Sequence, residues 1–406
     1  MPAIGFVAVW MVVFAIPWEN ILILPGVGTI TRLLGMIAVG ITLCVILVRG
    51  RLRKPGPFHW LALLFLLYSC ASLYWTIDRE ETAARVWINL QLAALLWLIW
   101  EASSTASRRA ALMQAYVFGA WVTCYQTYEM FRAGIGRVGG TRFAASENFN
   151  PNDMGFLLVL ALPMAWHLSI TYRNVLLRWI NRLYIPAGLF TIALTGSRSG
   201  LILSGLTLCL VPWTLQQINL RIKVLTAGIL AVGVALALTY APTRTLERLM
   251  TTQTELTQGT LNERTEIWRA GMEVLPQYML IGAGAGTYSH AVRAELSGDH
   301  SAHNAYVSVV VELGLVGLVL FLALLAVSFQ HARMAPPAER KLLIILWLTL
   351  LVGLMPRAWE AKKATWLVFG LVNASAVAGA LARAPLPPEP RLSRTTPRRR
   401  PIPGAV

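Results

Sequence analysis

Two histidines, His300 and His303, stand at the start of a long apolar run, residues 304–330. An apolar helix gains nothing from an imidazole at its end, so these residues indicate chemistry. The ordinary pKa of histidine, about 6.5, lets its neutral ring accept a proton near neutral pH. The segment therefore predicts a general base at the mouth of a hydrophobic helix.

Two arginines lie in segments that could present them to an anion. Arg198 sits in TGSRSG (195–200), whose small residues leave room for a ligand at the guanidinium. Arg264 begins the amphipathic segment 261–278, where it could stack on Trp268 one turn later. A planar guanidinium is a natural partner for two phosphate oxygens. The alternatives are snorkelling of Arg198 at a helix end and an interfacial helix with a solvated Arg264.

The limits of the helix expected over 261–278 come from Asn262 as N-cap and Pro276 as its stop.

The segment GAGAGTY (282–288) has no preceding strand and no following Lys-Ser/Thr pair, so we interpret it as a glycine turn that lets backbones pass closely. Glu312 lies half a turn away from the direction of His303, which predicts a buried pairing with a neighbouring helix instead.

Metal and cofactor chemistry find little support in the sequence. The aspartates are Asp78, Asp153 and Asp299, and none forms an Asp-x-Asp pair of the kind that holds a divalent ion in many nucleotide-sugar transferases. We therefore expect no metal site, no cofactor and no nucleic-acid partner.

The whole chain has the composition of a membrane protein with many spans. Of its 406 residues, 56% are hydrophobic and 13% are charged, against roughly 25% charged in a typical soluble domain. We predict an all-α fold with about twelve transmembrane helices, each of about 20 mostly apolar residues, and a long periplasmic loop before the tenth. The candidate spans lie near residues 4–17, 29–48, 58–75, 84–100, 110–131, 153–171, 183–195, 199–216, 222–241, 304–330, 340–355 and 364–382.

Charge then orients the spans. More than half of the 35 basic residues fall on one side if both termini are cytoplasmic, as the positive-inside rule requires. Residues 172–182 are interpreted as a basic interfacial turn on that side. The predicted division is spans one to nine over 1–242, a periplasmic loop with amphipathic helices over 243–303, spans ten to twelve over 304–382, and a basic, disordered cytoplasmic tail over 383–406 that touches membrane lipids.

Most of the remaining basic residues lie where this topology disfavours them, in 132–142, 195–200, 243–303 and 356–363. Positive charge kept on the outer side indicates an anion-binding site. The alternatives are contact with anionic headgroups, or chance in a long loop that is translocated regardless of its charge.

Four segments, in this order, resemble the O-antigen ligase family, which is similar to the O-antigen polymerases and the bacterial protein O-oligosaccharyl ligases. They are RFAASENFNPNDMG (142–155), TGSRSG (195–200), NERTEIW (262–268) and HNAYVSVVVELGLVG (303–317). The resemblance spans roughly residues 130 to 330. The segments do not separate ligase from polymerase, although one dominant outer loop favours the ligase.

The resemblance implies an enzyme in the inner membrane of a Gram-negative bacterium, with its active site on the periplasmic side. Such an enzyme moves an O-antigen chain from undecaprenyl pyrophosphate to the lipid A core oligosaccharide, by direct displacement and without a metal. Carried over, His303 is the base, and Arg198 and Arg264 engage the pyrophosphate. Arg142 joins them with less support, and Asn152, Asn304 and Trp268 are expected to line the site.

The rival class is a transporter of a lipid-linked sugar. A transporter predicts inverted repeats, broken helices and charges near the membrane midplane. The notable charges here gather at one face, and no internal repeat is evident in the sequence.

Overall fold

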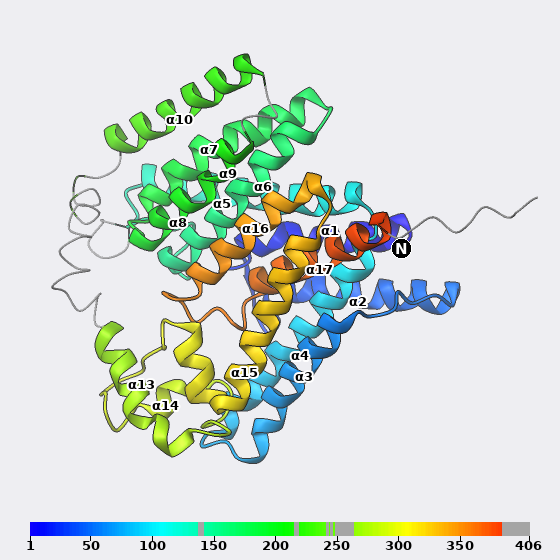
Figure 1. The fold of residues 1–406 in the computed structure, drawn as a ribbon. Helices are drawn as coiled ribbons and strands as arrows, with labels where there is room; N and C mark the ends of the chain where they lie inside the picture. Colours follow the sequence, from blue (N-terminus) through cyan, green and yellow to red (C-terminus); the bar gives the residue numbers. More distant parts are fainter. Residues whose placement is uncertain (137–141, 215–218, 241–242, 244–246, 248–263, 384–406) are drawn as a thin grey trace, which may run out of the picture.

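The computed structural model describes residues 1–136, 142–214, 219–240, 243, 247 and 264–383, and these residues are mostly helical (Figure 1). The tail over 384–406, and Asn262, lie outside the described residues. The helices are α1 (Ala3–Ala15), α2 (Ile30–Arg49), α3 (Pro57–Ala71), α4 (Arg79–Ala102), α5 (Ala106–Arg132), α6 (Pro151–Thr171), α7 (Val175–Leu194), α8 (Arg198–Leu208), α9 (Leu210–Thr214), α10 (Leu220–Tyr240), α13 (Arg264–Tyr278), α14 (Tyr288–Ala291), α15 (Ala305–Met334), α16 (Pro337–Gly353) and α17 (Lys363–Arg383).

The helical prediction is confirmed in its main lines. Each expected span overlaps a helix. Among the residues that the structure describes, five helices are long and apolar enough to cross a membrane by themselves, namely α2, α3 with its 3-10 extension, α4, α6 and α15. The count of about twelve spans stays a prediction. A two-stranded antiparallel hairpin, β1 (Ile23–Leu24) with β2 (Gly28–Thr29), is a small departure from an all-α fold.

Two local predictions are wrong. Residues 172–182 are not a turn, because α7 already begins at Val175, where the Asn174 side chain accepts a hydrogen bond from the backbone of Leu177 at 3.0 Å. That N-cap lets the helix start before the apolar part of the sequence. Pro276 does not stop α13, which runs on to Tyr278. A proline this close to a helix end removes only one interior hydrogen bond.

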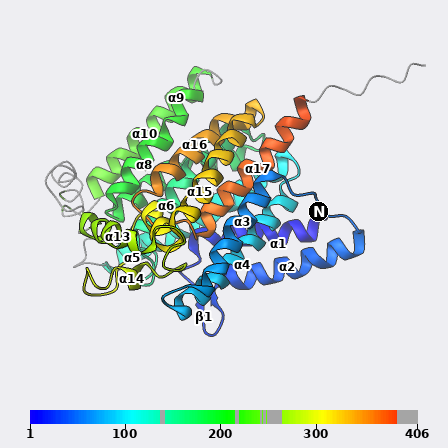
Figure 2. The same ribbon diagram turned by 60° about the horizontal axis from the view of Figure 1, so that its bottom comes forward.

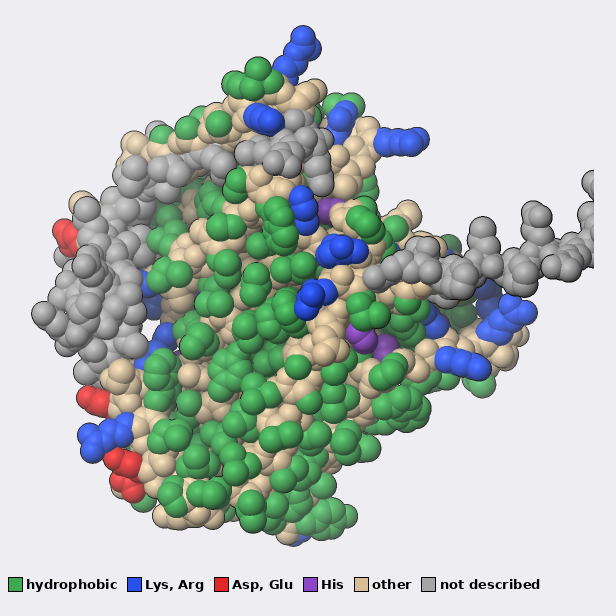
Figure 3. Space-filling view, in the orientation of Figure 1, with side chains coloured by type: hydrophobic (Ala, Val, Ile, Leu, Met, Phe, Trp, Pro, Cys, Tyr) green, Lys and Arg blue, Asp and Glu red, His purple; other side chains and the backbone are tan. Residues whose placement is uncertain are grey.

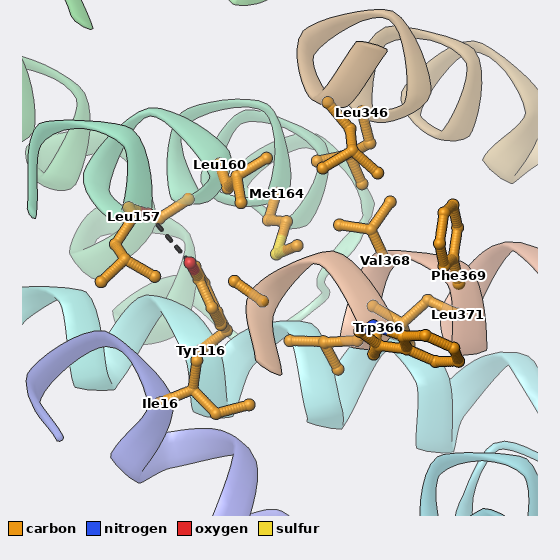
Figure 4. Close-up of a cluster of buried hydrophobic side chains, with 14 of the residues drawn as sticks. Ile16, Tyr116, Leu157, Leu160, Met164, Leu346, Trp366, Val368, Phe369 and Leu371 are labelled. Carbon is orange, nitrogen blue, oxygen red and sulfur yellow. Dashed lines mark hydrogen bonds between the residues drawn. The ribbon is translucent and has the colours of Figure 1, made fainter. Parts of the chain in front are cut away.

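α6 lies at the centre of the bundle, with 89% of its apolar window buried. Its side chains pack against those of α5, α16 and α17 (Figure 4). The hydroxyl of Tyr116 on α5 donates a hydrogen bond to the carbonyl of Leu157 at 3.0 Å inside this core. Because α6 is held on all sides, its N-terminus is a rigid platform for whatever side chains it carries.

The connections between helices gather at two ends of the bundle. At one end, Arg108 donates to the carbonyl of Met1 at 2.7 Å, and buried Arg109 pairs with Glu339 at 2.8 Å. The backbone of Arg53 donates to Glu101 at 2.9 Å at the same end. These are the connections that the charge pattern assigns to the cytoplasmic side.

Other contacts join the connections assigned to the outer side. The Ser146 hydroxyl donates to the carbonyl of Asn20 at 3.0 Å, and the backbone of Ile77 donates to Ala283 at 2.9 Å. The backbone of Ala305 donates to Leu354 at 2.9 Å. On the face shown in Figure 3, apolar side chains fill the broad middle, while many of the lysines and arginines lie toward its margins.

Labelling of single cysteines tests this sidedness. Ser104 and Ala294 are both exposed, one at each end of the bundle. In a background without the native cysteines, an impermeant maleimide added to intact cells with a permeabilised outer membrane should label Ala294→Cys and leave Ser104→Cys unmodified. Lysed cells, in which both sites react, provide the control. The reverse pattern would invert the topology and move the candidate site to the cytoplasm.

Candidate functional site

The N-terminal ends of α6 and α8 meet at the end of the bundle that the charge pattern assigns to the outer side. Gly155, in the first turn of α6, packs against the Thr195–Ser197 turn so closely that an added Cβ would lie 3.4 Å from the side chain of Ser197. Gly196 adopts a φ of 59°, and Ser197 then caps α8 by accepting a hydrogen bond from the backbone of Gly200 at 3.2 Å. The left-handed turn needs glycine, because a Cβ disfavours that conformation.

Arg142 joins these two helix ends. Its side chain is buried, and it donates from Nε to the carbonyl of Thr195 at 2.9 Å and from NH2 to Oδ1 of Asn152 at 2.6 Å. Arg198 is the first residue of α8 and is half-buried beside the same turn. The segments carrying Arg142, Asn152 and Arg198, which the sequence singled out separately, therefore come together.

Arg357, in the connection between α16 and α17, is a residue of this site that sequence reasoning missed. It is 2% exposed, and it donates from Nε and NH2 to the carbonyl of Asn152 at 3.2 and 2.8 Å. NH2 also donates to Oγ of Ser199 at 2.9 Å, and Asp153 lies 3.9 Å from Nε. Its guanidinium covers the ring of Phe156 at 4.9 Å. Its segment, 356–363, was among the basic segments on the predicted outer side, but nothing in the sequence singled out Arg357 within it.

The charge on Arg357 is poorly compensated. Burial is the main cause that lowers its pKa to about 10, Asp153 opposes this, and the positive charges of Arg264 and Arg142 lower it further. Its buried NH1 atom has no hydrogen-bond partner among the residues that the structure describes. A buried cation with an unused donor and cationic neighbours favours an anion at this position.

α13 brings the outer segment against the start of α15. Trp268 donates from its indole to the carbonyl of Ala302 at 2.9 Å, directly before His303. The hydroxyl of Tyr288 donates to the carbonyl of Ile267 at 2.6 Å. Trp268, which we expected to line the site, thus braces the loop that carries the histidine.

His303 is the one residue other than glycine with a positive φ, 47°, in the described part of the chain. The next residue, Asn304, caps α15 by accepting hydrogen bonds from the backbones of Tyr306 and Val307 at 2.9 and 3.2 Å. Asn304 thus caps α15, and its expected place in the lining of the site stays a prediction. A non-glycine residue held in the left-handed region is strained, and such strain is often found at functional positions.

The surroundings of His303 favour its neutral form. Burial is the largest cause that lowers its pKa, and the nearby positive charges of Arg264 and Arg357 lower it further, against an opposing effect of Asp153. A neutral imidazole can accept a proton. His300 also lies near, but its Nε2 is 2.9 Å from the carbonyl of Ser297 in its own loop.

The glycine turn, residues 282–288, packs against α15, the helix that begins just after His303. Gly282 and Gly284 have positive φ, and the backbones of Ala283 and Gly284 donate to the carbonyls of Val311 and Glu312, both at 2.9 Å. A Cβ on Gly282 would overlap the Glu312 backbone, so the predicted close passage is confirmed.

The predicted pairing of Glu312 with a neighbouring helix is also confirmed. NH2 of Arg85 on α4 lies 3.9 Å from Oε2 of Glu312, and the backbone of Gly286 donates a hydrogen bond to the same oxygen at 2.7 Å. Ser308 donates to Oε1 at 3.1 Å. Glu312 thus holds the glycine turn and α4 against α15, and it does not orient His303.

The described residues thus form an apolar helical bundle, with several arginines gathered near His303 at one end. Comparison with protein families adds to this description. Residues 183–322 match the family model described as O-Antigen ligase, which supports a place for this part of the chain in the O-antigen ligase superfamily. The matched segment includes Arg198, Arg264 and His303, whereas Arg142 and Arg357 lie outside it. A search of curated proteins found no match.

Proposed function

We propose that this protein is an inverting O-antigen ligase that transfers a glycan from undecaprenyl pyrophosphate to the lipid A core oligosaccharide at the periplasmic face of the inner membrane. The observation that carries the proposal is the meeting of His303 with the charges of Arg264, Arg357 and Asp153. These residues come from separate outer segments of the chain. One base beside a group of cations is what transfer from a pyrophosphate carrier requires.

In the proposed reaction, an acceptor hydroxyl attacks the anomeric carbon from the face opposite the pyrophosphate. The new bond forms between the hydroxyl oxygen and this carbon, the bond from carbon to the phosphate oxygen breaks, and His303 takes the hydroxyl proton. The leaving pyrophosphate carries away the electron pair. Its growing negative charge is balanced by Arg198, Arg264 and Arg357, which act as preorganised donors.

Among the described residues, no group of three His, Cys, Asp or Glu side chains is placed to hold a metal ion. The proposed mechanism assigns to arginine the charge neutralisation that a divalent ion supplies in other transferases. We therefore expect transfer to proceed in excess chelator and without nucleotide.

Reconstitution of the purified protein in lipid nanodiscs tests the proposal. It is given a polyprenyl-pyrophosphate glycan and a lipid A core acceptor, with EDTA and without ATP. We expect a preassembled glycan on lipid A, with inverted anomeric configuration. A longer glycan on the polyprenyl carrier would identify a polymerase, a glycan on added protein would identify a protein ligase, and movement of unaltered donor between leaflets would identify a transporter. Activity that returns only with Mg²⁺ or Mn²⁺ would contradict the arginine mechanism.

The lowered pKa of His303 predicts the acidic limit of activity. A general base works only when it is deprotonated, so kcat/KM should fall as pH drops through the histidine pKa of the free enzyme. Because that pKa is below 6.5, the fall in kcat/KM should occur below pH 6.5. The corresponding fall in kcat should occur at a higher pH, since bound pyrophosphate stabilises the imidazolium. Rates measured from pH 5 to 8 check both limbs, and a kcat/KM limb above pH 7 would contradict the assignment.

A further inference from the structure

A groove of about 580 Å³ lies between α1, α2 and α4, helices that pack against one another (Figures 1 and 2). It is separate from the site described above. Its walls are apolar, with Met36 and Val39 on α2 and Leu90 and Leu95 on α4. Only 17% of the apolar window of α2 is buried, so this helix forms an outer wall that faces the lipid. The groove therefore offers space for hydrocarbon.

Two cations stand at one end of the groove. Lys363 pairs with Glu19 at 2.6 Å, whereas Arg32 donates to the carbonyl of Val27 at 3.0 Å. Within the part of the chain that the structure describes, no carboxylate forms an ion pair with Arg32. After the pairing of Lys363 with Glu19, this end carries one uncompensated positive charge.

The charged end of the groove opens at the same end of the bundle as His303. Lys363 follows directly on the connection that carries Arg357. The residue after Glu19, Asn20, accepts a hydrogen bond from Ser146 at 3.0 Å, in the segment that carries Arg142. A lipid headgroup at Arg32 is thus presented on the side where glycan transfer takes place.

We propose that this groove binds the acyl region of the acceptor glycolipid, with one of its phosphate groups at Arg32. The inference rests on the proposed function, in which two lipid-borne substrates must meet at one end of the protein. One uncompensated charge matches a single phosphate, whereas the several arginines near His303 match a pyrophosphate. A guanidinium with unused donors is suited to phosphate oxygens. Met36, Trp87 and Leu90 line the groove and are exposed, so acyl chains can enter it from the bilayer.

Gly35 allows the groove to be filled without disturbing its walls. It lines the groove, and a Cβ added there meets no atom within 4 Å. Gly40 lies farther along the same helix, is exposed, also has free space at its Cβ, and does not line the groove. Gly35→Phe and Gly40→Phe therefore make the same chemical change in the same helix, inside and outside the proposed site.

Transfer kinetics in nanodiscs give the first readout. Gly35→Phe should raise the KM for the acceptor at least about 10-fold while the donor KM is unchanged, because it displaces roughly a few buried methylenes. Gly40→Phe should match the unmodified protein. Arg32→Gln should also raise the acceptor KM, with Arg49→Gln at the other end of α2 as its control. A rise in the donor KM alone would instead assign the groove to the polyprenyl chain and overturn the proposal.

Photo-crosslinking gives a second readout that needs no transfer. Lipid A carrying a diazirine in one acyl chain should label residues of α2 and α4, and Gly35→Phe should abolish this labelling while Gly40→Phe retains it. Labelling that excess phosphatidylethanolamine removes equally well would mean an ordinary bilayer lipid occupies the groove. Transfer without labelling would overturn this inference alone. Labelling without transfer would contradict the ligase function and leave the groove as a lipid A site.

Discussion

Replacing His303 with alanine should abolish glycan transfer while donor binding survives. The proposed imidazole acts on the proton of the acceptor hydroxyl, so its loss removes general-base catalysis, which is typically worth about 10²–10⁴-fold in rate. The left-handed backbone at His303 remains available to alanine only with strain. The measurement is therefore the single-turnover rate together with donor affinity, made on purified protein with an unchanged melting temperature.

His300→Ala is the matched control for this prediction. His300 lies three residues earlier, is also half-buried, and has its ring nitrogen beside the carbonyl of Ser297. Its loss removes one imidazole from the same loop but not the proposed base, so we expect a mild effect. His303→Asn offers a folded alternative, because asparagine tolerates a positive φ. Full activity of either His303 variant would contradict the assignment of His303 as the base. A His300→Ala variant as inactive as His303→Ala would contradict it too.

Replacing Arg357 with alanine should weaken donor binding about 10- to 100-fold, since a hydrogen bond to a charged group contributes roughly 1.5–3 kcal/mol. Arg357→Lys should restore part of the affinity, because lysine keeps the charge but cannot make two parallel hydrogen bonds. Arg293→Ala, an exposed arginine at the same end, serves as the control for a general loss of positive charge. Donor affinity is measured with a polyprenyl pyrophosphate in nanodiscs.

Because Arg357 also holds the backbone of Asn152 and the side chain of Ser199, its loss could act through structure alone. Stabilisation of the folded protein by the donor separates these possibilities. If Arg357 binds the donor, added polyprenyl pyrophosphate should raise the melting temperature of the unmodified protein more than that of Arg357→Lys, although both fold. A lysine variant that is stabilised by the donor as strongly as the unmodified protein would leave Arg357 a structural role only.

Hydrophobicity and charge along the sequence were enough to predict the helices and the sorting of their connections. Long apolar segments such as 304–330 have few alternatives to helix, because a backbone in an apolar medium must satisfy its own hydrogen bonds. The glycine turn near Gly284 and the buried pairing of Glu312 also followed from local chemistry. His303, Arg198 and Arg264 were singled out because each lies in a distinctive short segment, and their roles stay predictions.

Only the tertiary structure decided which of those segments come into contact. Arg357 lies in a short connection between α16 and α17, and nothing in its neighbours indicates that it reaches Asn152 on α6. The capping role of Asn304 depends on the backbone angles at one residue, and the continuation of α7 and α13 depends on caps and packing that outweigh local propensity. The groove beside Arg32 exists only because α1, α2 and α4 pack together. The contact of Arg357 with Asn152 and the packing around the groove join segments far apart in the sequence, so their energy is set by which surfaces meet and not by the residue types along one segment.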